Sequence, residues 1–201
     1  MLWLDLETTG DQPGVDEIVE VAAIRTGRDL VEQDTFTGIV PPSPFGFGRI
    51  ESNPIVRDMH ITSGLLAELR AADAGGQGFV SGNVLAGVEQ LLLSWFPDDV
   101  QITIAGSGVA AFDIPMIRVA MPALAARLTY FSLDVGPLRR FYHLANGRHL
   151  VEVNKQKTHR AMDDVLCHLE EGRAFRDLFR GAADCGLSDS VRSRCASEGA
   201  R

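Results

Sequence analysis

The chain has no excess of basic residues. Its 201 residues include 19 Lys and Arg against 27 Asp and Glu, which gives a formal net charge of −8. A protein that coats long nucleic acid is usually basic. The composition therefore argues against a broad electrostatic nucleic-acid binder, and any contact with nucleic acid should be local, short or assisted by a metal ion.

Cysteine is also scarce. The three cysteines, Cys167, Cys185 and Cys195, are an odd number without C-x-x-C spacing, so they fit neither a zinc site nor a disulfide framework and suit a reducing compartment. The sequence has no signal peptide before Trp3 and no apolar run long enough to span a bilayer. We therefore expect a cytoplasmic protein without a membrane partner.

The sequence does contain enough apolar residues for one sizeable core, with 45% hydrophobic and 23% charged residues. Such a composition is typical of a single globular domain. We expect this domain to cover residues 1–180 and to be followed by a loose polar tail over residues 181–201.

Apolar runs and turn residues predict a meander of three strands over residues 1–7, 18–24 and 30–40. The Pro-rich residues 41–48 predict an irregular loop. The rest of the chain predicts short strands near residues 101–105 and 131–135, and helices over residues 63–71, 84–96, 113–128, 136–145 and 161–180. We expect the helical segment over residues 113–128 to be interrupted near Pro122. Strands followed by alternating helices and strands indicate an α/β fold, a mixed sheet with helices on its faces.

An acidic pair, Asp5 and Glu7, lies within the apolar N-terminal segment. Side chains of a strand alternate between its faces, so the leucines at positions 2, 4 and 6 should face one side and the two acids the other. Two neighbouring acids on a buried strand repel each other and lose hydration, and a divalent cation between them is the usual remedy. An exposed edge strand with a solvated polar face would explain the pair without a metal.

Two later motifs supply further candidates. Asp113 follows Phe112 and a loop of small residues at the start of a predicted helix, where an ordinary N-cap aspartate would also fit. His159 lies just before the last long helix and Asp164 in its first turns. A surface or capping histidine and an acid that complements the helix macrodipole would explain these two residues separately.

In this order, Asp5, Glu7, Asp113, His159 and Asp164 resemble the site residues of the DEDDh exonucleases, whose fold is ribonuclease H-like. Three further stretches, residues 56–65, 133–135 and 158–165, are similar to matching stretches of the oligoribonucleases. The resemblance covers roughly residues 1–180, and it implies a ribonuclease H-like mixed β-sheet flanked by helices.

The resemblance also implies an activity. The chain would be a metal-dependent 3′–5′ exonuclease that releases 5′-mononucleotides from short single-stranded RNA or DNA, with RNA favoured. Asp5, Glu7 and Asp164 would hold one Mg²⁺ or Mn²⁺, and Asp5 would bridge to a second ion with help from Asp113. Carboxylate oxygens suit these ions better than Zn²⁺. His159 would take the proton from the attacking water, because an imidazole titrates near neutrality.

By the same resemblance, Thr8, Thr9 and His60 would line the pocket of the terminal nucleotide. Oligoribonucleases are dimers, so the resemblance implies a homodimer. In that dimer Tyr130 could reach the site of the partner and stack on a base.

Three departures from the oligoribonuclease pattern bear on substrate length. Ser107 lies in a loop that lacks the Asn-Ser pair of the family, Ile55 takes the place of a Trp, and Phe131 with Ser132 replaces an Arg after Tyr130. Groups that would grip the end of a very short RNA are thus missing. We therefore expect activity on short single strands without a sharp preference for dinucleotides.

Two alternatives stay open at this point. A DNA-trimming or proofreading-type exonuclease of the same superfamily is one, because the Phe112-Asp113 pairing resembles that branch. The other is a catalytically silent nucleic-acid-binding module on the same fold. Metal-dependent turnover of a labelled oligonucleotide separates these classes.

Overall fold

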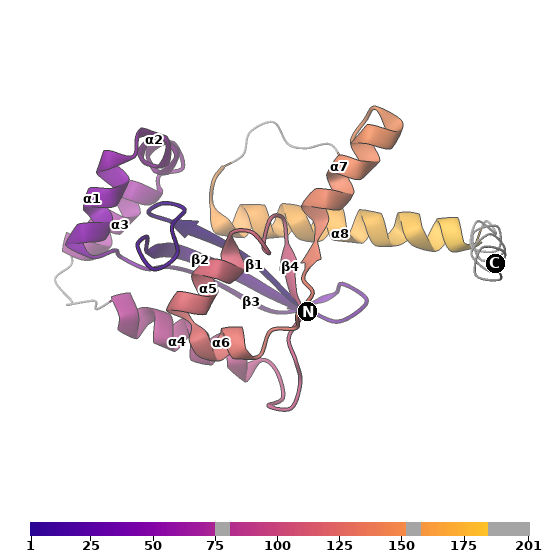
Figure 1. Cartoon of the computed structure of the whole chain (residues 1–201), viewed down its shortest axis with the longest axis horizontal. Coiled ribbons are helices and arrows are strands. Elements are labelled where there is room, and N and C mark those ends of the chain that lie inside the picture. Colours follow the sequence, from indigo (N-terminus) through magenta and orange to yellow (C-terminus); the bar gives the residue numbers. More distant parts are fainter. Residues whose placement is uncertain (75–80, 152–157, 185–201) are drawn as a thin grey trace, which may run out of the picture.

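The computed structural model describes residues 1–74, 81–151 and 158–184. Its centre is a five-stranded sheet in the order β3-β2-β1-β4-β5 (Figure 1). The strands are β1 (Leu2–Thr8), β2 (Ile18–Thr26), β3 (Glu32–Ile39), β4 (Ile104–Gly106) and β5 (Leu133–Asp134). The first three strands form an antiparallel meander, while β4 runs parallel to β1 and β5 parallel to β4. The predicted mixed sheet is confirmed.

The described helices cover both faces of the sheet and one of its ends. They are α1 (Pro44–Ser52), α2 (Pro54–Thr62), α3 (Leu65–Ala74), α4 (Ser81–Ser94), α5 (Asp113–Ala120), α6 (Pro122–Ala126), α7 (Val135–Asn146) and α8 (Ala161–Asp184). In Figure 1, α4, α5 and α6 lie on one side of the sheet and α8 on the other, while α1, α2 and α3 form a group beside the end of β1 and β2.

The alternation predicted for the first strand explains this layering. Leu4 and Leu6 join the core beneath α4, α5 and α6. Trp3 points to the opposite face, where it packs with Val165 and Leu169 of α8. Asp5 and Glu7 share the face of Trp3, and they therefore meet the start of α8 at the carboxyl end of β1.

The sequence-based expectation for residues 41–48 is wrong, because α1 begins within this segment. Pro44 lies at the first helical position, where the missing N–H has no intrahelical partner to lose. Ser43 caps the helix, since its hydroxyl accepts a hydrogen bond from the Gly46 N–H at 3.1 Å. The proline density of this segment thus marks a helix start.

Other boundaries also differ from expectation. The sequence analysis missed α2, whose N-cap Asn53 accepts hydrogen bonds from the N–H groups of Ile55 and Val56. The interruption predicted near Pro122 is confirmed, since α5 ends at Ala120 and α6 begins at Pro122. The last helix extends to Asp184, into the predicted tail, and the remainder of that tail lies outside the described residues.

None of the helices in the described ranges is long and apolar enough to cross a membrane. The described part of the chain also holds one free and exposed cysteine, Cys167.

Candidate active site

A cavity of about 480 Å³ opens at the carboxyl end of β1. Its wall comes from β1 and the turn after it, from α2, from the loop before α5, and from α8. The residues that line it are Asp5, Leu6, Glu7, Thr8, Gly10, Asp11, Asn53, Ile55, Val56, Met59, Ser107, Phe112, Asp113 and Asp164. Five carboxylates that are up to 159 positions apart in the sequence therefore border one space, and four of them, those of Asp5, Glu7, Asp113 and Asp164, are the predicted ones.

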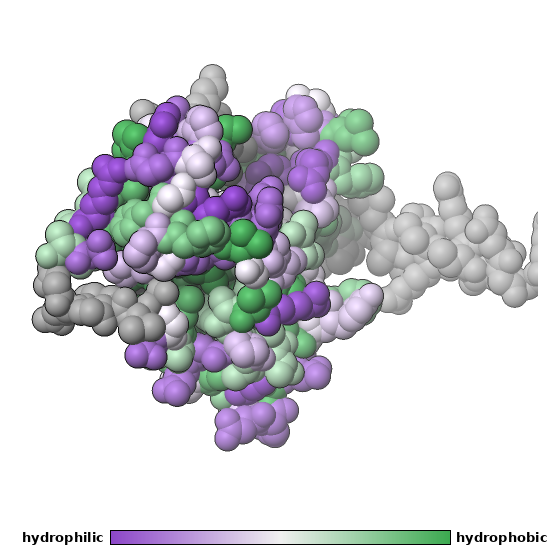
Figure 2. All heavy atoms as spheres, turned by 60° about the vertical axis from the view of Figure 1, so that its left-hand side comes forward, coloured by the Kyte–Doolittle hydropathy of each residue, from purple (hydrophilic) through white to green (hydrophobic). Residues whose placement is uncertain are grey.

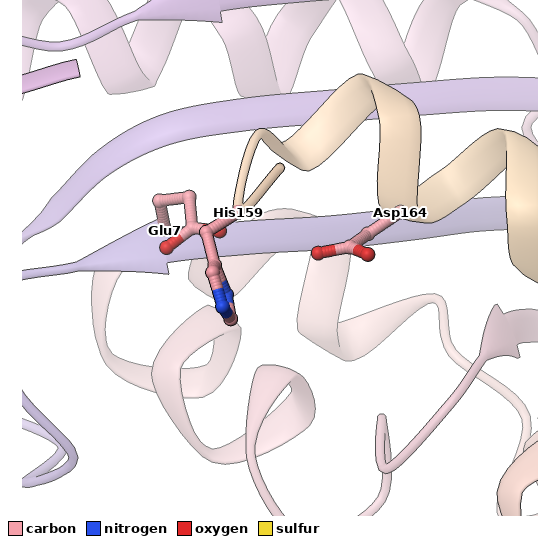
Figure 3. A group of neighbouring side chains, drawn as sticks. All are labelled: Glu7, His159 and Asp164. Carbon is pink, nitrogen blue, oxygen red and sulfur yellow. The ribbon is translucent and has the colours of Figure 1, made fainter. Parts of the chain in front are cut away.

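Two of the lining residues, Glu7 and Asp164, lie close to His159, which is not itself among the residues that line the cavity. One potential ligand atom from each residue lies within 4.8 Å of those of the other two. Figure 3 shows Glu7 on its strand, with His159 and Asp164 reaching the same region from the start of α8. Glu7 is buried, while His159 and Asp164 are partly exposed. The structure thus brings these three predicted residues together.

Asp113 is the most deeply buried of the predicted carboxylates that border the cavity. It is the first residue of α5 and is only 3% exposed, while Phe112 occupies the cap position without a side-chain cap. Burial raises the pKa of Asp113 to about 7, hydrogen bonds from the backbone of Asp113 and Leu6 oppose this, and the charge of Asp134 adds to it. The N-cap alternative for Asp113 is therefore wrong.

The Asp113 Oδ1 atom gives a direct test of whether a cation fits this site. This atom is buried and has no hydrogen-bond partner within the described residues. An uncompensated buried carboxylate oxygen is costly, and a bound divalent ion would remove that cost. Together with the carboxylates of Asp5, Glu7 and Asp164, it makes a set of hard oxygen donors that fits Mg²⁺ or Mn²⁺.

The chain enters α8 through an unusual backbone conformation at His159, with φ of 51°. This left-handed region is uncommon for residues other than glycine, although histidine is among those that adopt it more often. Immediately after it, Arg160 forms ion pairs with Glu20 at 2.9 Å and with Glu68 at 2.8 Å. The Ala161 N–H donates to Glu20 Oε2 at 3.0 Å.

Sequence reasoning missed Glu20 and Arg160. A signal for Glu20 existed, because it is an acid within the continuous apolar run of β2, where it is 2% exposed. Acids are almost never buried without a partner. Its partner Arg160 lies 140 positions away, so neither residue pointed to the other in the sequence.

Of the predicted substrate contacts, Thr8 lines the cavity, and its hydroxyl donates to the Gly10 carbonyl at 2.5 Å. Thr9 is instead used inside the loop: its hydroxyl donates to Asp16 and accepts from the Glu17 N–H, each at 2.9 Å. Asp16 is in turn held by Arg49 through two hydrogen bonds of 2.9 Å, and these hold the pKa of that carboxyl below its usual range.

His60 is fully buried behind the cavity wall. Its Nε2 lies 2.8 Å from the Thr8 carbonyl, and its Nδ1 lies 3.9 Å from Glu7 Oε2. Burial lowers the pKa of His60, with smaller opposing effects from the Thr8 hydrogen bond and the charge of Glu20. His60 therefore contacts the backbone at the end of β1, and its ring is not among the groups that line the cavity.

Tyr130 is not among the residues that line the cavity; it precedes β5 and is 92% exposed. Its ring meets that of Phe131 edge to face at 4.8 Å. Arg139 of α7 donates hydrogen bonds to Ser107 Oγ at 3.0 Å and to Glu171 Oε2 at 2.8 Å. Arg139 therefore supports the cavity wall through Ser107.

Comparison with known proteins agrees with this geometry. The family model RNase_T, described as "Exonuclease", matches residues 2–46. The chain is 31% identical over 184 residues to the oligoribonuclease of Cutibacterium acnes, covering 89% of this chain and 85% of that protein. It is 30% identical over 183 residues to the oligoribonuclease of Tropheryma whipplei, covering 89% and 92%.

Solved structures share the fold of the chain. Exonuclease I from Methylocaldum szegediense superimposes with a TM-score of 0.62 at 16% identity, over 88% of this chain and 40% of that one. Exonuclease I of E. coli in complex with an oligonucleotide gives 0.55 at 19% identity, with the same coverage. The chain thus spans about 40% of the length of these two exonucleases.

Proposed function

This chain belongs to the oligoribonuclease family, and from that premise we propose that it is a 3′–5′ exonuclease that releases 5′-mononucleotides from short single-stranded oligonucleotides, with RNA favoured. The observation that carries the proposal is the grouping of Glu7, His159 and Asp164 beside one cavity, which Asp5 and Asp113 line together with Glu7 and Asp164. The ribonuclease H-like sheet supports it by placing the carboxyl end of β1 against the start of α8.

We propose that Asp5, Glu7 and Asp164 hold one Mg²⁺ or Mn²⁺ and that Asp5 and Asp113 hold a second. Ions bound there would supply charge stabilisation for the attacking and leaving oxygens of the phosphodiester. The partnerless Oδ1 of Asp113 supports this assignment, because a buried acceptor without a donor favours a cation.

His159 is the general base in this proposal and takes a proton from the attacking water. It is partly exposed and lies beside Glu7 and Asp164, so its ring can reach a water at the cavity. The substrate is held on the other side of the cavity by Thr8 and by the apolar wall of Ile55, Val56 and Met59. The volume of about 480 Å³ suits a small ligand such as one terminal nucleotide.

We also propose that the protein acts as a homodimer in the cytoplasm. Large apolar side chains are exposed on α7 and at the start of β5: Phe141 is 72% exposed, Leu144 82% and Phe131 78%. The face seen in Figure 2 mixes hydrophilic and hydrophobic residues. A second copy would cover the apolar side chains. The isolated exposed Cys167 suits a reducing compartment.

The proposal is tested with 5′-labelled RNA and DNA of two to about ten nucleotides, with Mg²⁺ or Mn²⁺ and with a chelator. We expect stepwise shortening from the 3′ end, only with metal, faster on RNA, and without a tenfold preference for the dinucleotide, which would equal about 1.4 kcal/mol. Asp164→Asn should abolish turnover, while Asp163→Asn, a change in an exposed neighbouring acid, should not. Full activity of Asp164→Asn, or turnover in chelator, would reject the proposal.

A further inference from the structure

Glu20 occupies a special position in the sheet. It lies directly opposite Glu7 in the antiparallel pairing of β1 and β2, so both carboxylates face α8. Glu20 is 2% exposed, and the proposed reaction does not use it. A buried acid beside another acid requires a compensating cation, and Arg160 supplies one.

The contacts of Glu20 fix the first residues of α8. Arg160 donates from Nη2 to Glu20 Oε1 at 2.9 Å, and its Nε donates to the same oxygen at 3.1 Å. Ala161 donates its N–H to Glu20 Oε2 at 3.0 Å. Glu20 therefore caps the helix from a neighbouring strand while it also binds the side chain of the preceding residue.

Glu68 of α3 completes this arrangement from the outside. It accepts hydrogen bonds from Arg160 Nη1 at 2.8 Å and from Nη2 at 2.9 Å, and its side chain is 49% exposed. The Arg160 guanidinium thus lies between a buried carboxylate and an exposed one. The fork of an arginine holds such a geometry, and the single charge of a lysine does not.

We call the contacts of Arg160 and Ala161 with Glu20 the clamp. The residue just before it is His159. Its backbone has φ of 51°, a conformation that a free chain end would leave for more populated regions. Residues 160 and 161 are both hydrogen-bonded to Glu20. These bonds restrict the backbone conformation of His159 from its C-terminal side. The direction of the imidazole toward Glu7 and Asp164 depends on this setting (Figure 3).

We infer that Glu20 and Arg160 are positioning residues for His159: the carboxylate of β2 and the guanidinium at the start of α8 hold the imidazole at the cavity. The inference rests on the proposed function, in which His159 is the general base. Supporting residues of this kind change the activity of a site by about 10–100-fold when they are replaced.

The main test variant is Glu20→Gln. It keeps an oxygen that can accept from the Ala161 N–H, and it leaves Arg160 paired with Glu68, so no charge is stranded in the core. We expect kcat for a short RNA to fall about 10–100-fold with KM unchanged. Amide hydrogen exchange over residues 158–164 should become faster, which is a readout independent of turnover.

The variant Arg160→Gln distinguishes a loss of His159 positioning from a change in the local charge. The two substitutions change the local charge in opposite directions, so an effect on the charge of the site would move kcat in opposite directions. Loss of positioning lowers kcat in both variants. If Arg160→Gln lowers the melting temperature strongly, the combined Glu20→Gln, Arg160→Gln protein, in which no ion is stranded, takes its place.

A double-mutant cycle with His159→Ala shows whether the clamp acts through His159. With His159 removed, Glu20→Gln should cost nothing further in kcat. Arg173→Gln is the matched control, because Arg173 anchors α8 to the Leu30 carbonyl and to Glu32, away from the cavity. Its kcat should equal that of the wild type.

The outcomes distinguish this inference from the proposed function. A normal kcat in Glu20→Gln together with a large loss in His159→Ala would overturn the inference and keep His159 as the base. Additive losses in the double variant would also overturn it, since Glu20 would then act by another route. A normal kcat in His159→Ala would instead reject the proposed base.

Discussion

Asp113 is the residue at which burial and charge oppose each other most strongly. Its carboxyl is 3% exposed, and burial raises its pKa from the ordinary value of 3.8 to about 7. In the metal-free fold, the Asp113 carboxyl therefore favours the protonated form below about pH 7. A cation bound at the proposed site would favour the ionised form, so its binding would release a proton and weaken as the pH falls.

This conflict predicts a pH-dependent stability of the metal-free protein. Because the pKa of Asp113 is raised in the folded state, its contribution is fully present below about pH 4 and is lost as the pH rises toward about 7. The total is on the order of 4 kcal/mol at most. We expect Asp113→Asn to stabilise the protein in chelator at about pH 8, with a smaller effect at about pH 5.

Denaturant unfolding of both proteins at the two pH values measures this effect, with Asp98→Asn as a control in an exposed acid. The difference in the free energy of unfolding between Asp113→Asn and the wild type should grow with pH. An equal difference at both values would show that the Asp113 carboxyl is not held in the protonated form.

His159 gives the second prediction. Replacing it by Ala should lower kcat by roughly 10²–10⁴, the range for a lost general base, with little change in the affinity for Mn²⁺. Single-turnover rates and calorimetric Mn²⁺ titration measure the two effects. A large loss of Mn²⁺ affinity would show that the imidazole, which lies within 4.8 Å of the Glu7 and Asp164 ligand atoms, acts as a metal ligand.

At the scale of single residues, the sequence predicted the site candidates that lie in local motifs. Asp5, Glu7, Asp113, His159 and Asp164 could be found because each motif is local and the order of motifs is specific. Glu20 and Arg160 could not be found in this way, because their relation exists only once β2 lies beside α8. The burial of His60 behind Thr8 likewise depends on the placement of α2, which the sequence analysis missed.

Helix α8 connects the site to the core, and a glycine controls how closely it approaches the sheet. A Cβ atom at Gly172 would overlap the indole ring of Trp3 in β1, whereas a Cβ at Gly181 of the same helix would meet no other atom within 4 Å. Trp3 is itself fixed, because its Nε1 donates to the Thr26 hydroxyl at 3.1 Å.

These two glycines form a matched pair for the third prediction. Gly172→Ala should destabilise the protein by about 1–3 kcal/mol through overpacking. Gly181→Ala should stabilise it by about 0.5–1 kcal/mol, because alanine is the better helix former. Thermal and denaturant unfolding of both variants measure the effect. If Gly172→Ala were as stable as Gly181→Ala, close packing of α8 on Trp3 would be excluded.

The elements themselves were predictable to different degrees. The central strands and α8 follow from clear apolar patterns, and Leu4 and Leu6 indeed face away from the two acids. Helix α1 was missed because Pro44 and the glycines of this segment are poor helix formers, and Ser43 and the proline together mark only its start. The N-cap contributes more to the formation of such a short helix than the helix propensities of the residues within it do.

At the scale of the molecule, the described elements leave an apolar surface exposed. Phe141 and Leu144 of α7 are largely exposed, and Tyr142 of the same helix contacts Phe175 of α8 with ring centroids 6.3 Å apart. The combined Phe141→Asp, Leu144→Asp change should therefore turn the proposed dimer into a monomer. Light scattering measures the mass at micromolar concentration.

Val119→Asp is the control for this fourth prediction, because Val119 is 56% exposed on α5, which packs on the opposite face of the sheet. Its mass should stay that of a dimer. Activity measured on the monomer then tests the proposed role of Tyr130 in the site of the partner. A wild-type protein that is monomeric and fully active would refute both the dimer and that role.

The order in which the chain leaves the ribosome gives the layering of the sheet a consequence of its own. The antiparallel strands β1 to β3 can pair within the first 40 residues, but the face that carries Trp3 stays open until α8 is made. Asp164 and His159, at the beginning of that last described helix, reach Glu7 at the same late step. With the proposed site residues, a growing chain would therefore be inactive toward the RNA around it until α8 has docked on the sheet.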